Sequence, residues 1–147
     1  MRRTVCLLAA LLVLPSLGSD EPTAFDGATT RDGLEGTWEL VSSGYGGQQS
    51  PPLPLNSPCI QTYRRGKWTY HQAGRLVNEG TYKADSRRKP AFLDETTTAG
   101  PEAGRTEKYI YQLDGDRLRT AFRQDHRARP KSFDEDGVLI VIYKRVK

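Results

Sequence analysis

The stretch LEGTWELVSS, residues 34–43, places a glycine two positions before a tryptophan and then alternates apolar with polar residues. Alternation of this kind over a short run is typical of a β-strand with one buried face. Gly36 and Trp38 therefore mark either a functional site or the first strand of a fold. The choice depends on the rest of the chain.

Short strand-like runs recur after this stretch, and none shows the length or the 3.6-residue period of a helix. We expect eight strands, at 36–42, 60–63, 67–72, 76–83, 91–97, 107–113, 117–123 and 138–144. The one long gap, GYGGQQSPPLPLNSP, is rich in glycine and proline, which predicts a loop. The pattern predicts an all-β fold, an eight-stranded antiparallel up-and-down barrel, with a β-sandwich as the alternative that periodicity does not exclude.

Two hairpins are predicted in detail. The run YRRGKWTY, residues 63–70, turns at Arg65-Gly66 and would place Tyr63 near Trp68 or Tyr70. In the run YIYQLDGDRLRTAF, Asp114-Gly115-Asp116 lies between two alternating segments. An even-length turn would put Tyr109, Tyr111 and Leu113 on the same face as Leu118, Thr120 and Phe122. The opposite face carries Arg117, Arg119 and Arg123. We therefore expect one buried face and one solvated face.

The beginning of the chain has the pattern of an export signal. Met1-Arg2-Arg3 precedes an apolar run over residues 5–14, and the small residues Ser16 and Gly18 follow it. The apolar run is shorter than the ~20 residues that span a bilayer. We predict a signal peptide at 1–18, a flexible lead-in at 19–33 and one barrel domain at 34–147. The mature protein would be periplasmic or extracellular, without a membrane span, and a monomer.

Cysteine content and charge narrow the expectations further. Cys6 would leave with the signal peptide, so Cys59 would be the one thiol of the mature protein, a small buried hydrophobe with no disulfide partner. The formal net charge of +4 includes Arg2 and Arg3, and acidic and basic residues are mixed. The densest basic run, RQDHRARPK at 123–131, is expected to be a solvated loop, and nucleic-acid binding is not expected.

Several segments resemble a known family. Gly36-Thr37-Trp38 at the start of the first strand and Lys144-Arg145 at the end of the last resemble the signature of lipocalins and related calycin barrels. The segments LEGTWELVSS, GTYKAD, KPAFLD, GPEAGRT, YIYQLDGDRL, RPKSF and GVLIVIYKR are similar to an uncharacterised lipocalin-like domain common in exported planctomycete proteins. One departure is Ala121, at a position where that family often has cysteine.

This resemblance implies a fold and an exported location, and it implies no activity. It also implies a structural role for Gly36, Trp38 and Arg145. Trp38 would plug the closed end of the barrel, and a basic residue of the final strand, Arg145 or Lys144, would pack over its ring. Guanidinium on indole is a favourable cation–π contact.

The usual catalytic sets are sparse. His71 and His126 are the only histidines, and Asp125-His126 by itself does not form a metal site. A Cys59–His71 nucleophile pair lacks a third, orienting group. The acidic run 134–136 lacks the spacing of a calcium loop and is expected to be a turn. We predict no metal, no cofactor and no catalytic residue.

Aromatic residues recur on the faces expected to point inward. They are the tentative ligand-binding residues: Trp68, Tyr70, Tyr82, Tyr109, Tyr111 and Phe122. Small eight-stranded barrels are either filled by side chains or hold one small ligand, and tyrosine hydroxyls suit a cavity with a few polar anchors. Gly80 is expected to leave room beside Tyr82.

Two functions fit this pattern best, and an enzyme, such as a hydrolase with His71 and His126 as its candidate residues, is the third hypothesis. The first is an exported binding module for a small, largely apolar ligand, held at the end of the barrel away from Trp38. The alternative is an extracytoplasmic scaffold without a cavity, whose loop after the first strand and whose basic loop at 123–131 contact an exported protein partner.

Overall fold

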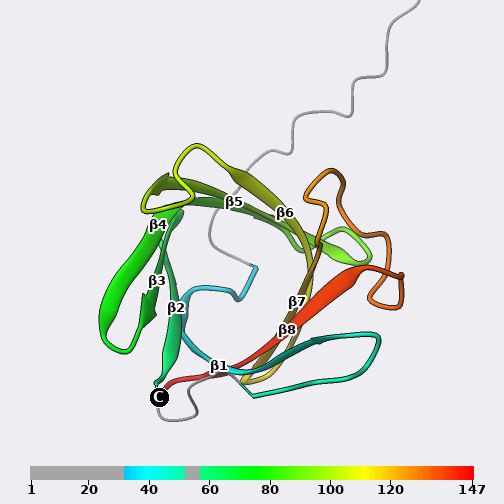
Figure 1. Ribbon diagram of the computed structural model, residues 1–147, viewed down its shortest axis with the longest axis horizontal. Coiled ribbons are helices and arrows are strands. Elements are labelled where there is room, and N and C mark those ends of the chain that lie inside the picture. The colour runs from blue at the N-terminus through cyan, green and yellow to red at the C-terminus, as the bar shows by residue number, and fades with distance from the viewer. Residues whose placement is uncertain (1–31, 52–56) are drawn as a thin grey trace, which may run out of the picture.

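The computed structural model describes residues 32–51 and 57–147, which form eight β-strands and no helix. The strands are β1 (Gly36–Tyr45), β2 (Cys59–Arg64), β3 (Lys67–Gln72), β4 (Arg75–Asp85), β5 (Ala91–Ala99), β6 (Thr106–Asp114), β7 (Arg117–Arg123) and β8 (Val138–Arg145) (Figure 1). All eight predicted strands are confirmed, and most extend one to three residues further. The predicted signal peptide, and all of the lead-in before Asp32, lie outside the described residues.

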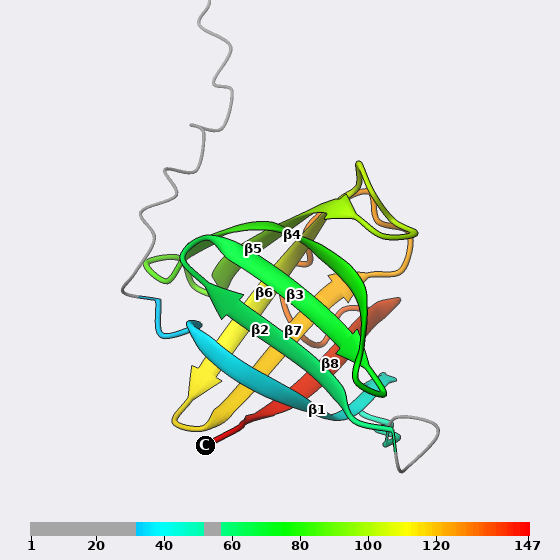
Figure 2. The ribbon, with the colours of Figure 1, turned by 90° about the vertical axis from the view of Figure 1, so that its left-hand side faces the viewer.

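The strands close into a barrel. Each strand pairs antiparallel with the next along the chain, and β8 pairs with β1 to complete the circle. The predicted up-and-down barrel is therefore confirmed, and the sandwich alternative is wrong. Closure leaves no strand edge exposed, so the fold needs no disulfide to protect an edge. Figure 2 shows the β6–β7 turn and the chain's C-terminus at one end, and the β5–β6 and β7–β8 loops at the other.

The hairpin predicted at Asp114-Gly115-Asp116 is formed by β6 and β7. Leu113 pairs with Leu118, and Tyr111 pairs with Thr120, so the inward face is the one that the sequence predicts. Gly115 and Asp116 form the turn between Asp114 and Arg117, which are themselves paired. Because the turn has two residues, the inward-facing side chains of β6 pair with inward-facing side chains of β7, as expected.

The outer face of this hairpin is not wholly solvated, and that part of the prediction is wrong. Ile110 and Ala121 point outward and are fully buried. A second hydrophobic cluster forms around them, from Ile110, Ala121, Val138, Ile140 and Ile142, with Phe92 and Phe133 packed against it. The chain between β7 and β8 brings Phe133 over this face, and the Arg119 guanidinium lies 4.1 Å from the Phe133 ring.

The basic run at 123–131 is also only partly solvated, which corrects the prediction of a simple surface loop. Pro130 is fully buried, and the Arg129 side chain is only 16% exposed. Arg129 pairs with Asp94, donates to the backbone oxygen of Leu93 at 3.2 Å, and lies 4.2 Å from the Phe92 ring. A charged side chain that makes these contacts anchors the β7–β8 loop to the barrel wall.

Gly80 has a different role from the one predicted. It lies at a register shift in the β4–β5 pairing, where the strands approach closely. A Cβ atom at Gly80 would lie 1.8 Å from the backbone oxygen of Thr96. Glycine is needed there because the backbones of β4 and β5 touch. Gly80 therefore does not leave room for a ligand beside Tyr82.

Trp38 closes one end of the barrel. Its side chain is fully buried, and its indole Nε1 donates to the backbone oxygen of Leu34 at 2.8 Å. Leu34 is also fully buried, in the segment that precedes β1 and lies across the ring of strands in Figure 1. The cluster around them contains Leu34, Trp38, Tyr63, Trp68, Tyr82, Ala84, Leu93, Tyr111 and Leu118.

The structure places Arg145 over Trp38. The guanidinium carbon is 4.1 Å from the ring centroid, and the group donates to the backbone oxygens of Glu35 at 2.8 Å and Gly33 at 3.0 Å. Lys144, the other candidate, instead pairs with Glu39 at 3.0 Å and is mostly exposed. One guanidinium therefore covers the indole and fastens the segment before β1 to β8.

The glycine two positions before Trp38 is explained by this same contact. Gly36 has a φ of 136°, which side-chain-bearing residues rarely adopt. A Cβ atom at Gly36 would lie 2.5 Å from Nη1 of Arg145. Gly36, Trp38 and Arg145 thus form a single structural device at the closed end.

Replacing Trp38 by alanine should lower the free energy of unfolding by ~3–5 kcal/mol, because it removes a buried aromatic and leaves a cavity. Urea denaturation measures the change. Leu76→Ala is the control, since Leu76 is half exposed and should cost well under ~1 kcal/mol. Similar losses in the two variants would contradict the closing role of Trp38.

Replacing Gly36 by alanine should lower the free energy of unfolding more than Gly115→Ala does. Both positions have positive φ, but a Cβ at Gly115 meets nothing within 4 Å, whereas at Gly36 it meets Arg145. The strain of φ alone costs on the order of 1–3 kcal/mol, and displacement of Arg145 adds to it at Gly36. Equal losses by urea denaturation would show that the contact with Arg145 contributes little.

Candidate functional site

The barrel has a cavity that opens to solvent at the end opposite Trp38. Its volume is about 280 Å³, and all eight strands contribute to its wall. The lining residues are Leu40, Ser43, Gln61, Tyr63, Trp68, Tyr70, Asn78, Glu95, Glu102, Tyr109, Thr120, Phe122, Leu139, Val141 and Tyr143. We call this space the lumen. A smaller hollow of about 110 Å³ shares five of these residues and extends to a rim that includes Arg105, Glu107 and His126.

The aromatic residues singled out in the sequence differ in where they lie. Trp68, Tyr70, Tyr109 and Phe122 line the lumen, and Trp68 also belongs to the cluster around Trp38. Tyr82 and Tyr111 belong to the cluster around Trp38, in which the ring of Tyr82 meets that of Tyr63 edge-on at 5.0 Å. Only the residues that line the lumen are therefore placed to contact a molecule in it.

Glu95 is the residue of the lumen that the sequence analysis missed. It lies on β5 and is only 7% exposed, although it carries a carboxyl group. Tyr63 donates its hydroxyl hydrogen to Oε1 of Glu95, and Gln61 donates to the same oxygen at 3.1 Å. Alternation along β5 could have found it, because Glu95 shares a face with buried Leu93 and Thr97.

The environment of Glu95 shifts its protonation. Burial raises the pKa of the carboxyl group, hydrogen bonds from Tyr63, Tyr109 and Gln61 lower it, and the nearby charge of Glu107 raises it. The balance brings the pKa of Glu95 to about 7. Near neutral pH the lumen therefore exchanges between a neutral and a negatively charged state.

Two further polar atoms of the lumen have no partner. The indole Nε1 of Trp68, a residue only 5% exposed, and Oδ1 of Asn78 are both buried without a hydrogen bond. Buried polar groups in proteins are nearly always hydrogen-bonded to protein, water or ligand. Both atoms are buried within the wall, so a molecule in the lumen would reach them only if these side chains moved.

The rim of the open end carries charges of both signs. Arg105 pairs with Glu102 at 2.9 Å and with Glu107 at 3.6 Å, and Nδ1 of His126 contacts Glu107 at 2.5 Å. The His126 ring also stacks on Phe122, with centroids 5.8 Å apart. Including Glu95, three carboxyl groups surround the smaller hollow, against one guanidinium and one imidazole.

The sulfur and imidazole candidates are separated by the strand pairing. Ile60 pairs with His71, and Cys59 pairs with Gln72, so Cys59 and His71 point to opposite faces of the sheet. Cys59 is buried. Among the described residues, no three His, Cys, Asp or Glu side chains are grouped so that they could hold a metal ion.

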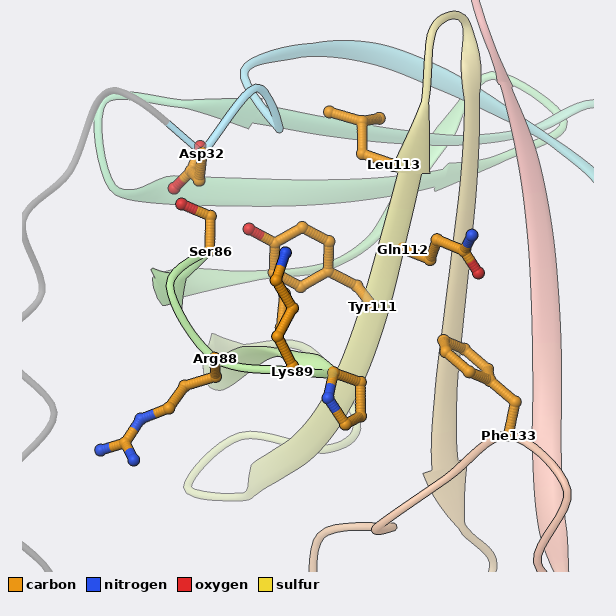
Figure 3. Close-up of a pocket in the computed structure, with 10 residues that line it drawn as sticks. Asp32, Ser86, Arg88, Lys89, Tyr111, Gln112, Leu113 and Phe133 are labelled. Atoms are coloured by element: carbon orange, nitrogen blue, oxygen red, sulfur yellow. The ribbon is translucent and has the colours of Figure 1, made fainter.

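A second hollow, about 510 Å³, lies on the side of the barrel near the closed end. Ser86, Arg88, Lys89 and Tyr111 are among the residues that line it. In Figure 3 the Tyr111 hydroxyl is directed to the side on which Asp32 and Ser86 lie, and Arg88 turns away. Burial raises the pKa of Asp32.

Comparison of the chain with protein-family models, with curated proteins and with solved structures found no match in any of the three. The resemblance to the planctomycete domain therefore stays a prediction. No helix in the described part of the chain is long and apolar enough to cross a membrane.

The pKa of Glu95 predicts a specific pH dependence of stability. The pKa is about 7 in the folded protein against an ordinary value of 4.5, so the folded state retains a proton that the unfolded state releases between these values. This stabilisation is fully present below about pH 4.5 and is lost as the pH rises through 7. From pH 5 to pH 8 we expect it to fall by on the order of 1–3 kcal/mol, at about 1.4 kcal/mol per pKa unit.

Glu95→Gln should remove this part of the pH dependence, because the amide does not titrate. Urea denaturation at several pH values between 5 and 8 measures the slope for the original protein and the variant. Glu39→Gln is the control, since Glu39 pairs with Lys144 near the barrel surface. A Glu95→Gln slope identical to that of the original protein would contradict the raised pKa.

Proposed function

We propose that this protein is an exported, lipocalin-like barrel that binds one small ligand in its lumen. The observation that carries the proposal is the 280 Å³ cavity at the end opposite Trp38. At about 30 Å³ per water molecule it has room for roughly nine waters. It lies near the lower end of the size range of ligand pockets, ~300–1,000 Å³, so the ligand would be small.

The character of the wall supports this proposal. Trp68, Tyr109 and Phe122 present aromatic surface, with the rings of Tyr109 and Phe122 meeting at 5.3 Å, and Leu139 and Val141 add aliphatic surface. Such a wall favours a ligand with a largely apolar body. The few polar groups among them, such as the carboxyl group of Glu95, would fix its orientation.

The division between the two ends of the barrel also supports it. Trp38, Leu34 and Arg145 fill and fasten the closed end, where no chemistry is needed. The open end keeps a cavity, with the buried carboxyl group of Glu95 in its wall. Export is proposed from the pattern of residues 1–18, and it would place the lumen in contact with small molecules outside the cytoplasm.

Filling the lumen should abolish binding of a neutral aromatic probe. Leu139 lines the cavity, so Leu139→Trp would occupy it. We expect 2-naphthol to bind the original protein, measured by isothermal titration calorimetry, and to bind Leu139→Trp at least tenfold more weakly. Leu76→Trp, the same change at a half-exposed position, should leave binding unaltered.

A cooperative urea transition in each variant shows that the barrel is retained. If neither 2-naphthol nor a panel of small neutral and charged aromatics binds the original protein, the proposed function is wrong. The same holds if Leu139→Trp binds them as well as the original protein does.

A further inference from the structure

Glu95 is an acidic group in a lumen without a basic partner. Among the described residues that line the 280 Å³ cavity, Glu95 and Glu102 are the only charged ones, and both are acidic. Burying a carboxylate away from water is costly unless a counter-charge or hydrogen bonds compensate for it. The barrel provides hydrogen bonds to Glu95 but no counter-ion inside the lumen.

A purely structural role does not account for Glu95. On the same face of β5, Leu93 fills the closed end as a fully buried apolar residue. At Glu95, Gln61 and Tyr63 of β2 both donate to one carboxylate oxygen, an arrangement that orients the group and stabilises its ionised form. Two side chains of β2 thus hold the carboxyl group at the wall of a cavity, where an apolar residue would stabilise the barrel more simply.

The rings around Glu95 add a second form of attraction for a positive charge. Trp68, Tyr109 and Phe122 line both the lumen and the smaller hollow together with Glu95. The face of an aromatic ring attracts a cation, by ~0.5–2 kcal/mol depending on desolvation. A carboxylate enclosed by aromatic rings is therefore suited to an organic ammonium group.

The rim carries both signs of charge. Glu102 and Glu107 lie at the smaller hollow with Arg105 and His126, and Arg105 pairs with both carboxylates. The preference for a cation therefore depends on Glu95 and the aromatic rings of the lumen.

We infer that the ligand of the lumen is a small organic cation, a protonated amine on a compact aromatic or alkyl body, whose ammonium group pairs with Glu95. This inference rests on the proposed lumen-binding function and specifies its ligand class. Binding would exclude water from the pair, and the aromatic wall would enclose the body of the ligand.

The test compares three probes of nearly the same size that differ in charge: 2-phenylethylamine, 2-phenylethanol and phenylacetate. Isothermal titration calorimetry at pH 8 measures their affinities for the full mature chain. We expect the amine to bind at least tenfold more tightly than the alcohol, and phenylacetate to bind more weakly than both. Equal affinities for the amine and the alcohol, or tightest binding of phenylacetate, would overturn the inference and leave lumen binding intact.

Glu95→Gln identifies the counter-ion. We expect it to weaken binding of 2-phenylethylamine at least tenfold and to change binding of 2-phenylethanol less than threefold. Glu39→Gln, on a carboxylate that pairs with Lys144, should change neither. An amine affinity that survives Glu95→Gln would overturn the pairing.

A measurement on the unaltered protein keeps the inference testable if Glu95→Gln does not fold. The groups that bond to Glu95 or interact with its charge are Gln61 and Tyr63 from β2, Tyr109 and Glu107 from β6, and Tyr143 from β8. The phenols ionise only well above neutral pH, because burial raises their pKa values. Amine affinity should therefore fall at least fivefold from pH 8 to pH 5.5, as Glu95 takes up its proton, while alcohol affinity stays within twofold. Parallel profiles for the two probes would overturn the inference.

If none of the three probes binds, a wider panel decides between the two proposals. Binding of neutral aromatics without any amine would overturn the inference alone. Absence of all binding would overturn the proposed function together with it.

Discussion

The barrel depends on the contact between the Arg145 guanidinium and the Trp38 indole. Strand pairing alone would close the circle of β-strands but would leave its base open to water. Trp38 fills that base, and Arg145 covers the ring while bonding to the backbone before β1. Because the same guanidinium bridges the chain's first described segment and its last strand, one side chain fastens two regions that are far apart in sequence. Gly36 is required because any side chain there would displace it.

A firmly closed base allows the other end to be less completely packed. The hydrophobic cluster around Trp38 and the outer cluster under Phe133 supply apolar burial on both sides of the barrel wall. Burial of this kind stabilises the fold without help from the open end. The lumen is therefore free to carry features that lower stability, including a buried carboxyl group and two polar atoms without partners. Functional sites are usually found where a protein sacrifices local stability and the remainder of the fold compensates for the loss.

Much of this architecture is predictable from the sequence, because local patterns decide it. Alternation and turn residues predict all eight strands, and the Asp-Gly turn predicts the register of β6 with β7. Arg129 and Pro130 show the limit of local patterns. A run of charges is usually solvated, and nothing in its composition indicates that Arg129 reaches Asp94 across the sheet or that Pro130 is buried. The buried outer face of the β6–β7 hairpin is unpredictable for the same reason. It depends on the path of the chain between β7 and β8, and alternation within the strands does not indicate that path.

Glu95 shows why the aromatic residues of the lumen are easier to predict from the sequence than the acidic group that lies among them. Apolar inward positions follow from a search for buried residues, and such a search passes over an acidic residue on the same face. The stretch AFLDETTTA places Glu95 in step with Leu93 and Thr97, so strict alternation alone predicts that it points inward. Its partners on β2 and β6 emerge only when the barrel closes, because the distance along the chain to Gln61 and Tyr63 exceeds thirty residues. The position of a charge can thus be inferred from one strand, whereas its pKa and the ligand class it favours depend on the assembled lumen.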